Sequence, residues 1–184
     1  GVQTCALPIF TVYSYIEPFL KNVAAFSDQG ITSTLMLLGV SGLFGSSLFS
    51  HFYNHFRYGV IRAGFIGLVA MLLLWQSAVA GKGTMVAACL LIGCASTLFN
   101  VTFQAELIRH VSIGAAPVAM SIFSGIFNVG IGGGTWIGGR VTAHGLLPYI
   151  GYAGAVTGLT ALVYCFVVYF HFLKKYSKKD KEIS

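Results

Sequence analysis

The sequence predicts an all-α membrane protein with six transmembrane helices. Of its 184 residues, 56% are hydrophobic and 9% are charged, whereas globular chains carry about 25% charged residues. The few charges are also spaced so that they leave uncharged runs, such as residues 30–50. These runs match the roughly 20 residues that a helix needs to cross a bilayer.

Each predicted helix is bounded by charges, by capping residues or by a turn. Ser27 and Asp28 are favourable N-cap residues for the second helix, and Pro117 is a favourable first-turn residue for the fifth. A short polar loop is expected at residues 54–57. The six predicted helices cover residues 10–26, 30–52, 58–80, 85–109, 117–140 and 148–173, and a charged tail follows at 174–184.

The distribution of Lys and Arg predicts the orientation of these helices. The tail, the loop after the second helix and the loop after the fourth share one side, because even numbers of helices separate them. That side carries Arg57, Arg62, Arg109, Lys174, Lys175, Lys178, Lys179 and Lys181, and the other side carries Lys21, Lys82 and Arg140. Since positive residues collect on the cytoplasmic side, we expect a cytoplasmic C-terminus. Five of the eleven Lys and Arg residues lie in the last eleven residues and the others are scattered between apolar runs, so the net charge of +6 does not indicate nucleic-acid binding.

The first nine residues stand apart from the rest. Residues 1–9 match the translation of one reading frame of a widely used sequencing adapter, and we interpret them as a non-native scar fused to a truncated gene. We expect this segment to be extended and without a packing role. The chain is then a fragment whose six-helix domain covers residues 10–173.

The stretch TVYSYIEPFL, residues 11–20, is the first candidate for a functional site. It places an acid, Glu17, and two phenols, Tyr13 and Tyr15, in an apolar helix. Intramembrane acids are costly and usually serve a substrate or proton pathway. Pro18 is expected to open the backbone one turn earlier, and Tyr13 and Glu17, four residues apart, are expected to share a helix face. The alternative is that Glu17 snorkels toward the interface or caps a neighbouring helix.

Polar side chains also follow one face of the fourth and fifth helices. In hydrocarbon such groups need partners across helices or a wet cavity. The positions, at spacings of three and four, are Thr97, Asn100 and Gln104 in the fourth helix and Ser121, Ser124 and Asn128 in the fifth. Near the end of the fourth helix, Glu106 and Arg109 are expected to form an interfacial ion pair.

Ridges of small residues predict where helices pack closely, because they let backbones approach one another in membranes. The ridges are Gly130, Gly134 and Gly138 in the fifth helix, Gly39, Gly42 and Ser46 in the second, and Gly154 and Gly158 in the sixth. The ridge of the fifth helix lies roughly opposite Asn128. We therefore expect one side of this helix to pack and the other to look into a cavity.

No catalytic, nucleotide-binding or metal-binding motif occurs in a usable context. The run GIGGGTWIGG lacks the preceding strand that a dinucleotide fingerprint requires. Cys89, Cys94 and Cys165 lie in apolar runs without metal-ligand spacing, and His51 and His55 have no third ligand nearby. The sequence therefore points neither to an enzyme nor to a cofactor or metal.

Three strings resemble a family of membrane transporters: TVYSYIEPFL in the first helix, FSGIFNVGIGGGTWIGGRV in the fifth and IGYAGAV in the sixth. They look like the C-terminal half of a bacterial sugar efflux transporter, in the drug:proton antiporter branch of the major facilitator superfamily. The resemblance covers residues 10–172. It implies that the six helices correspond to helices seven to twelve of a twelve-helix transporter. It also implies proton-driven export of small sugars, such as arabinose and thiogalactosides, across the inner membrane.

Two features depart from the family pattern. Residues 45–57 contain no Asp, so the acidic-and-basic loop signature of the superfamily is degenerate here. The N-terminal half, which usually carries much of the proton coupling, is absent. Two alternatives stay open: a drug exporter of the same fold, and a six-helix membrane scaffold that binds partners through its glycine ridges.

The resemblance gives the polar faces a role, because the substrate of such a transporter sits near the midplane between the halves. Carboxylates, amides and phenols suit sugar hydroxyls, and aromatic rings such as Phe123 suit the apolar face of the sugar. The expected substrate-binding residues are Tyr13, Tyr15, Glu17, Asn100, Gln104, Ser124 and Asn128. Glu17 is also the candidate for proton coupling, and the residues leave both roles open. The expected partners are a small sugar, protons, the bilayer and the N-terminal half, with no cofactor.

Overall fold

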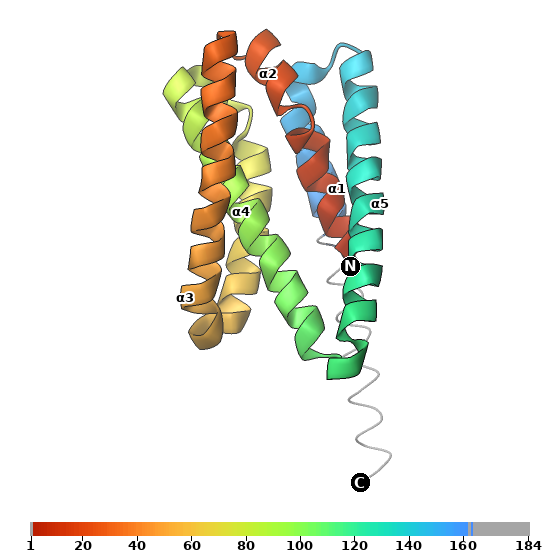
Figure 1. The fold of residues 1–184 in the computed structure, drawn as a ribbon. Coiled ribbons are helices and arrows are strands. Elements are labelled where there is room, and N and C mark those ends of the chain that lie inside the picture. The colour runs from red at the N-terminus through yellow and green to blue at the C-terminus, as the bar shows by residue number, and fades with distance from the viewer. Residues whose placement is uncertain (1, 162, 164–184) are drawn as a thin grey trace.

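A computed structural model describes residues 2–161 and 163, and every regular element in these residues is helical (Figure 1). The helices are α1 (Val2–Tyr13), α2 (Ile16–Asn22), α3 (Asp28–Leu74), α4 (Lys82–Arg109), α5 (Ala116–Ala143) and a last helix over residues 150–161. Short 3-10 turns, η1 (Ser77–Ala80), η2 (Ile113–Ala115) and η3 (Leu147–Tyr149), lie between them. The end of the predicted sixth helix and the basic tail lie outside the described residues.

Among the described residues, three segments are long and apolar enough to cross a membrane. They are Asp28–Phe56, Lys82–Arg109 and Ile113–Ala143, with 29, 28 and 31 residues. A bilayer core requires roughly 20 helical residues. The prediction of an all-α protein is confirmed for the described residues, with three segments that could cross a membrane by length and composition, and six crossings stay a prediction.

The second and third predicted helices are two separate arms of α3, as expected, and a sharp kink within the predicted 54–57 segment takes the place of a loop. The backbone departs from helical geometry at Phe56, where φ is −132° and ψ is 44°, and the chain folds back there (Figure 1). The polarity of Asn54 and His55 reflects their exposure at this end of the bundle and does not interrupt the helix. We call residues 28–55 the first arm of α3 and residues 57–74 its second arm.

The break between α1 and α2 confirms the expected effect of Pro18. The Tyr15 N–H donates to the carbonyl of Val12, three residues earlier, at 2.9 Å, so α-helical bonding is interrupted one turn before the proline. The predicted first helix is therefore two helices. The Gly30 N–H donates to the Ser27 hydroxyl at 3.2 Å, which confirms Ser27 as the N-cap of α3.

Residues 2–9 are helical, so the expectation of an extended, unpacked segment is wrong. They form the first two turns of α1, in which Ala6 and Ile9 are 0% and 3% exposed. The spacing of three places both apolar side chains on one helix face, and that face can be buried whatever the origin of the segment. Its origin as an adapter scar stays a prediction.

The long helices pack in two pairs, each of which joins the first half of the described chain to the second. Helix α1 packs mainly on α5, and α3 packs mainly on α4. If residues 2–74 form one unit and residues 82–161 the other, the first helix of each unit contacts the second helix of its counterpart. Such an exchange of contacts is what a two-fold relation between the units would produce.

The glycine ridge of α5 packs as predicted. Gly130, Gly134 and Gly138 are all buried. A Cβ atom added to Gly134 or to Gly138 would lie 2.6 Å from a backbone carbonyl oxygen of α1, closer than any real contact. Asn128, on the other side of α5, is exposed. The glycines therefore allow α1 and α5 to meet backbone to backbone.

The ridge that was predicted in the second helix, now the first arm of α3, packs against α4 at partly different residues. A Cβ atom added to Gly45 would clash with the carbonyl oxygen of Cys94 in α4, whereas one added to Gly39 would meet nothing within 4 Å. The close contact is therefore made at Gly42 and Gly45 and not at Gly39. Gly39 lines an open cleft, which is why no helix covers it.

The last helix closes the bundle behind α1. A Cβ atom added to Gly154 would lie 2.6 Å from a methyl group of Val12, and one added to Gly158 would meet Pro8 at an ordinary 3.5 Å. The predicted small-residue packing of this helix is confirmed. At one end of the bundle the rings of Phe19 and Trp75, both fully buried, lie 5.5 Å apart and join α2 to the segment after α3.

Candidate ligand cleft

A cleft of about 290 Å³ opens between α1, the first arm of α3, α4 and α5. It lies near mid-height of the three long apolar segments, because Gly42, Ser96 and Phe127 line it and each is close to the middle of its segment. Spanning helices of this length place their middle residues at the bilayer midplane. A ligand in this cleft would therefore be held within the membrane, away from both surfaces.

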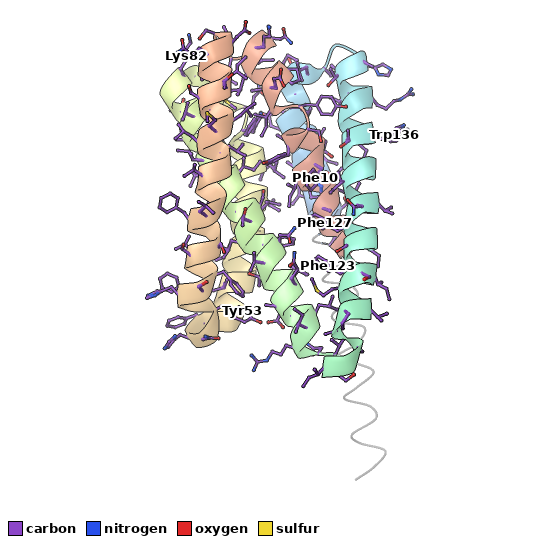
Figure 2. All side chains as sticks on the ribbon, in the orientation of Figure 1. Phe10, Tyr53, Lys82, Phe123, Phe127 and Trp136 are labelled. Atoms are coloured by element: carbon purple, nitrogen blue, oxygen red, sulfur yellow. The ribbon has the colours of Figure 1, made fainter. Side chains whose placement is uncertain are left out.

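One wall of the cleft is aromatic. Phe127 of α5 lines it together with Phe10 and Tyr13 of α1. Phe10 meets Phe127 edge to face at 5.8 Å, and Phe127 stacks on Phe123 at 5.9 Å with an interplanar angle of 12°. Figure 2 shows Phe10, Phe127 and Phe123 one below another in the gap between α4 and α5. Such rings present flat apolar surfaces with a slightly negative face.

The opposite wall, on α4, is polar. Ser96, Thr97 and Asn100 line the cleft within little more than one turn of this helix. Gln104, one turn further on, does not line it, and its amide nitrogen donates to the Asn100 side-chain oxygen. The two predicted amides therefore act together: Asn100 faces the cleft and Gln104 orients it.

Tyr15 lies outside the cleft and ties the α1–α2 break to α5. Its hydroxyl donates to the Thr135 carbonyl at 2.9 Å. The neighbouring Ser14 hydroxyl lies 2.9 Å from the Thr135 hydroxyl. The side chains of residues 14 and 15, at the break, thus bond across to the glycine-rich part of α5.

Glu17 is exposed on α2, at the end of the bundle that also holds Lys82 (Figures 1 and 2). Tyr13 closes α1 and Glu17 belongs to α2. The expectation that the two share a helix face is therefore wrong, because the break that Pro18 causes falls between them. Tyr13 lines the cleft and Glu17 does not.

Ser124 and Asn128 are exposed on α5 and do not line the cleft. The Asn128 amide donates to the Ser124 carbonyl of its own helix at 2.9 Å, and the Ser121 hydroxyl donates to the Pro117 carbonyl at 3.0 Å. Of the seven predicted substrate-binding residues, the structure brings Tyr13 and Asn100 to one cleft, with Gln104 behind Asn100.

Glu106 is bound by a tyrosine that no sequence pattern indicated. The Tyr53 hydroxyl, in the first arm of α3, donates to the Glu106 carboxylate at 2.5 Å. The sequence predicted an ion pair with Arg109, which is exposed. His110 lies 3.9 Å from the same carboxylate. This contact joins α3 to α4 beside the fold at Phe56, at the opposite end from Lys82 (Figure 2).

Two further results bear on the class of protein. No group of three or more His, Cys, Asp or Glu side chains in the described part of the chain is placed to hold a metal ion. No protein-family model matches the chain.

Proposed function

We propose that this chain is the six-helix C-terminal half of a proton-driven transporter that exports small sugars, of the arabinose or thiogalactoside type. The observation that carries the proposal is the cleft at mid-height, where an aromatic wall faces a polar one. Transporters of this architecture hold their substrate near the bilayer midplane, at the interface between repeats.

The two walls suit the two surfaces of a sugar. The apolar face of a sugar ring can pack on Phe10 and Phe127, as aromatic side chains commonly pack on flat partners. Its hydroxyls can bond the amide of Asn100 and the hydroxyls of Ser96 and Thr97. Buried polar groups that are left unpaired when a ligand lacks a hydroxyl give strong selectivity for the ligand that has it.

The reciprocal packing of two three-helix units also supports this class. Internal repeats related by a pseudo-two-fold axis are the building plan of many secondary transporters. In this proposal the helices that flank the cleft face a second six-helix half, encoded upstream, which completes the substrate cavity.

The proposed site of action is the bacterial inner membrane, with the end that holds Tyr53 and Phe56 in the cytoplasm and the end that holds Lys82 outside. The supporting pattern is the excess of Lys and Arg in the loops and tail assigned to the first of these ends. The tail itself lies outside the described residues.

The two alternative functions differ in what they require of the chain. A scaffold that binds partners through glycine ridges needs those ridges free, yet Gly45 and Gly134 meet helices of the same chain. A drug exporter of the same fold remains the competitor, because its cargo would also pack on Phe10 and Phe127. Sugar and drug cargo differ in their need for the polar wall on α4.

Protection of Asn100→Cys from thiol labelling tests the proposed site. In full-length protein lacking its native cysteines, a thiogalactoside should slow labelling of this cysteine, because the sugar would cover the α4 wall. Ser112→Cys, on an exposed position in the connection between α4 and α5, is the matched control and should be labelled at one rate with or without sugar. Protection by a cationic drug and not by the sugar would favour the drug exporter, and equal labelling under all conditions would remove the cleft from substrate binding.

A further inference from the structure

The hydroxyl of Ser96 is buried in the wall of the cleft, and no described residue gives it a hydrogen-bond partner. Leaving a buried donor and acceptor unbonded costs about 1–3 kcal/mol. We propose that Ser96 is a specificity-determining residue that binds one hydroxyl of the transported sugar. This inference rests on the function proposed above and deepens it.

Ser96 differs from the other buried hydroxyls of the helices that form the cleft. Serine and threonine in membrane helices commonly bond a carbonyl of the preceding turn. Ser41 donates to the Leu38 carbonyl at 2.6 Å, and Thr102 donates to the Leu98 carbonyl at 2.6 Å. Their hydroxyls are satisfied within the fold, whereas the Ser96 hydroxyl has no partner among the described residues and belongs to a residue that lines the cleft.

Two other buried polar atoms in the described residues share this lack of a partner, and neither lines the cleft. They are the indole nitrogen of Trp75 and the side-chain oxygen of Gln76, in the segment that follows α3. Of these three residues with a buried, unpartnered polar atom, Ser96 is the one that lines the cleft.

Asn100 supplies the second contact of the proposed subsite. It follows Ser96 by four residues, so the two share a helix face with a rise of about 6 Å between them, on the scale of one sugar ring. The Asn100 side-chain oxygen accepts from Gln104, which turns its amide N–H donors to the ligand. Ser96 can donate or accept. The pair therefore selects a ring that carries two spaced hydroxyls, one of which accepts from Asn100.

Binding of a thiogalactoside and its monodeoxy analogues to reconstituted full-length protein tests this assignment. Ser96→Ala should bind the parent sugar roughly three- to ten-fold more weakly, the loss expected for one neutral hydrogen bond. It should bind one deoxy analogue, the one lacking the partner hydroxyl, as well as the wild type does. Without ligand the variant should melt at the same temperature or higher, because an unbonded polar group is removed.

Two further variants make the result specific. Ser96→Cys keeps the shape of the side chain with a larger atom that is a weaker hydrogen-bonding group, and it should repeat the binding loss. Ser41→Ala removes a hydroxyl that is bonded within α3, and it should leave the ranking of the analogues unchanged.

The possible outcomes distinguish failure of the Ser96 assignment from failure of the proposed transport function. If the wild type binds the sugar and Ser96→Ala binds the parent and every analogue identically to it, Ser96 is not a ligand contact, although the transport function stands. If the wild type binds none of the sugars, both the function and this assignment are overturned.

Discussion

Gly45→Ala is expected to lower the free energy of unfolding by about 1–3 kcal/mol, the range for added atoms in a well-packed core. The new methyl group would meet the carbonyl oxygen of Cys94 and the amide nitrogen of Leu98 in α4. These are backbone atoms, so they cannot move aside as a flexible side chain can. The first arm of α3 and α4 would have to separate along their closest contact. Thermal unfolding of the detergent-solubilised protein measures the effect.

Gly39→Ala is the matched control on the same helix. A Cβ atom there meets nothing within 4 Å, and alanine favours a helix over glycine by up to about 1 kcal/mol. This variant should unfold at the same temperature as the wild type or higher. Equal melting of Gly45→Ala and Gly39→Ala would contradict the placement of α4 against Gly45.

Glu17 lies outside the cleft of this half, so its proposed role in export is proton exchange or a contact with sugar completed by the upstream half. On that basis Glu17→Gln is expected to reduce sugar export by roughly ten-fold or more in the full-length protein, the loss expected for a hydrogen bond to a charged group. Membrane insertion and melting temperature should not change, because the Glu17 side chain is exposed and packs against no core residue. A loss of export at constant stability would therefore reflect function. Export of radiolabelled thiogalactoside from proteoliposomes measures it.

The pH dependence of export separates the two roles of Glu17. If the carboxylate accepts sugar hydroxyls, glutamine should weaken binding modestly at every pH, because an amide can still make part of those bonds. If it exchanges the proton, binding should survive while the pH dependence of export disappears. Asp28→Asn, an exposed acid paired with Lys21 at 3.0 Å, should leave export unchanged. If Glu17→Gln exports sugar as the wild type does at every pH, Glu17 has neither role and its side chain only reaches toward the membrane interface.

The features that were predicted correctly from the sequence depend on local effects within one helix. Pro18 interrupts the helix one turn earlier wherever that helix packs, and Ser27 caps α3 with its own side chain. The ridge at Gly134 and Gly138 was also predictable, because three buried glycines at intervals of four leave a helix one side on which to pack. These signals need no knowledge of the partner helix.

The contacts that the sequence did not predict depend on helices far apart in the chain. Tyr53 reaches Glu106 because α3 and α4 meet, and nothing near either residue indicates this. The aromatic wall likewise combines Phe10 with Phe127. A spacing of four residues predicted that Glu17 lies beside Tyr13 on one helix face. That prediction is wrong because the two residues belong to different helices, α2 and α1. Which polar residues share a cavity is set by tertiary packing.

Proton-coupled transport by the complete gene product tests the central claim most directly. Proteoliposomes containing the protein with its upstream half should move thiogalactoside against its concentration gradient when an opposing proton gradient is imposed, and a protonophore should abolish this movement. Failure to move either thiogalactoside or arabinose under the same gradient, while the liposomes hold a stably folded protein, would contradict the account.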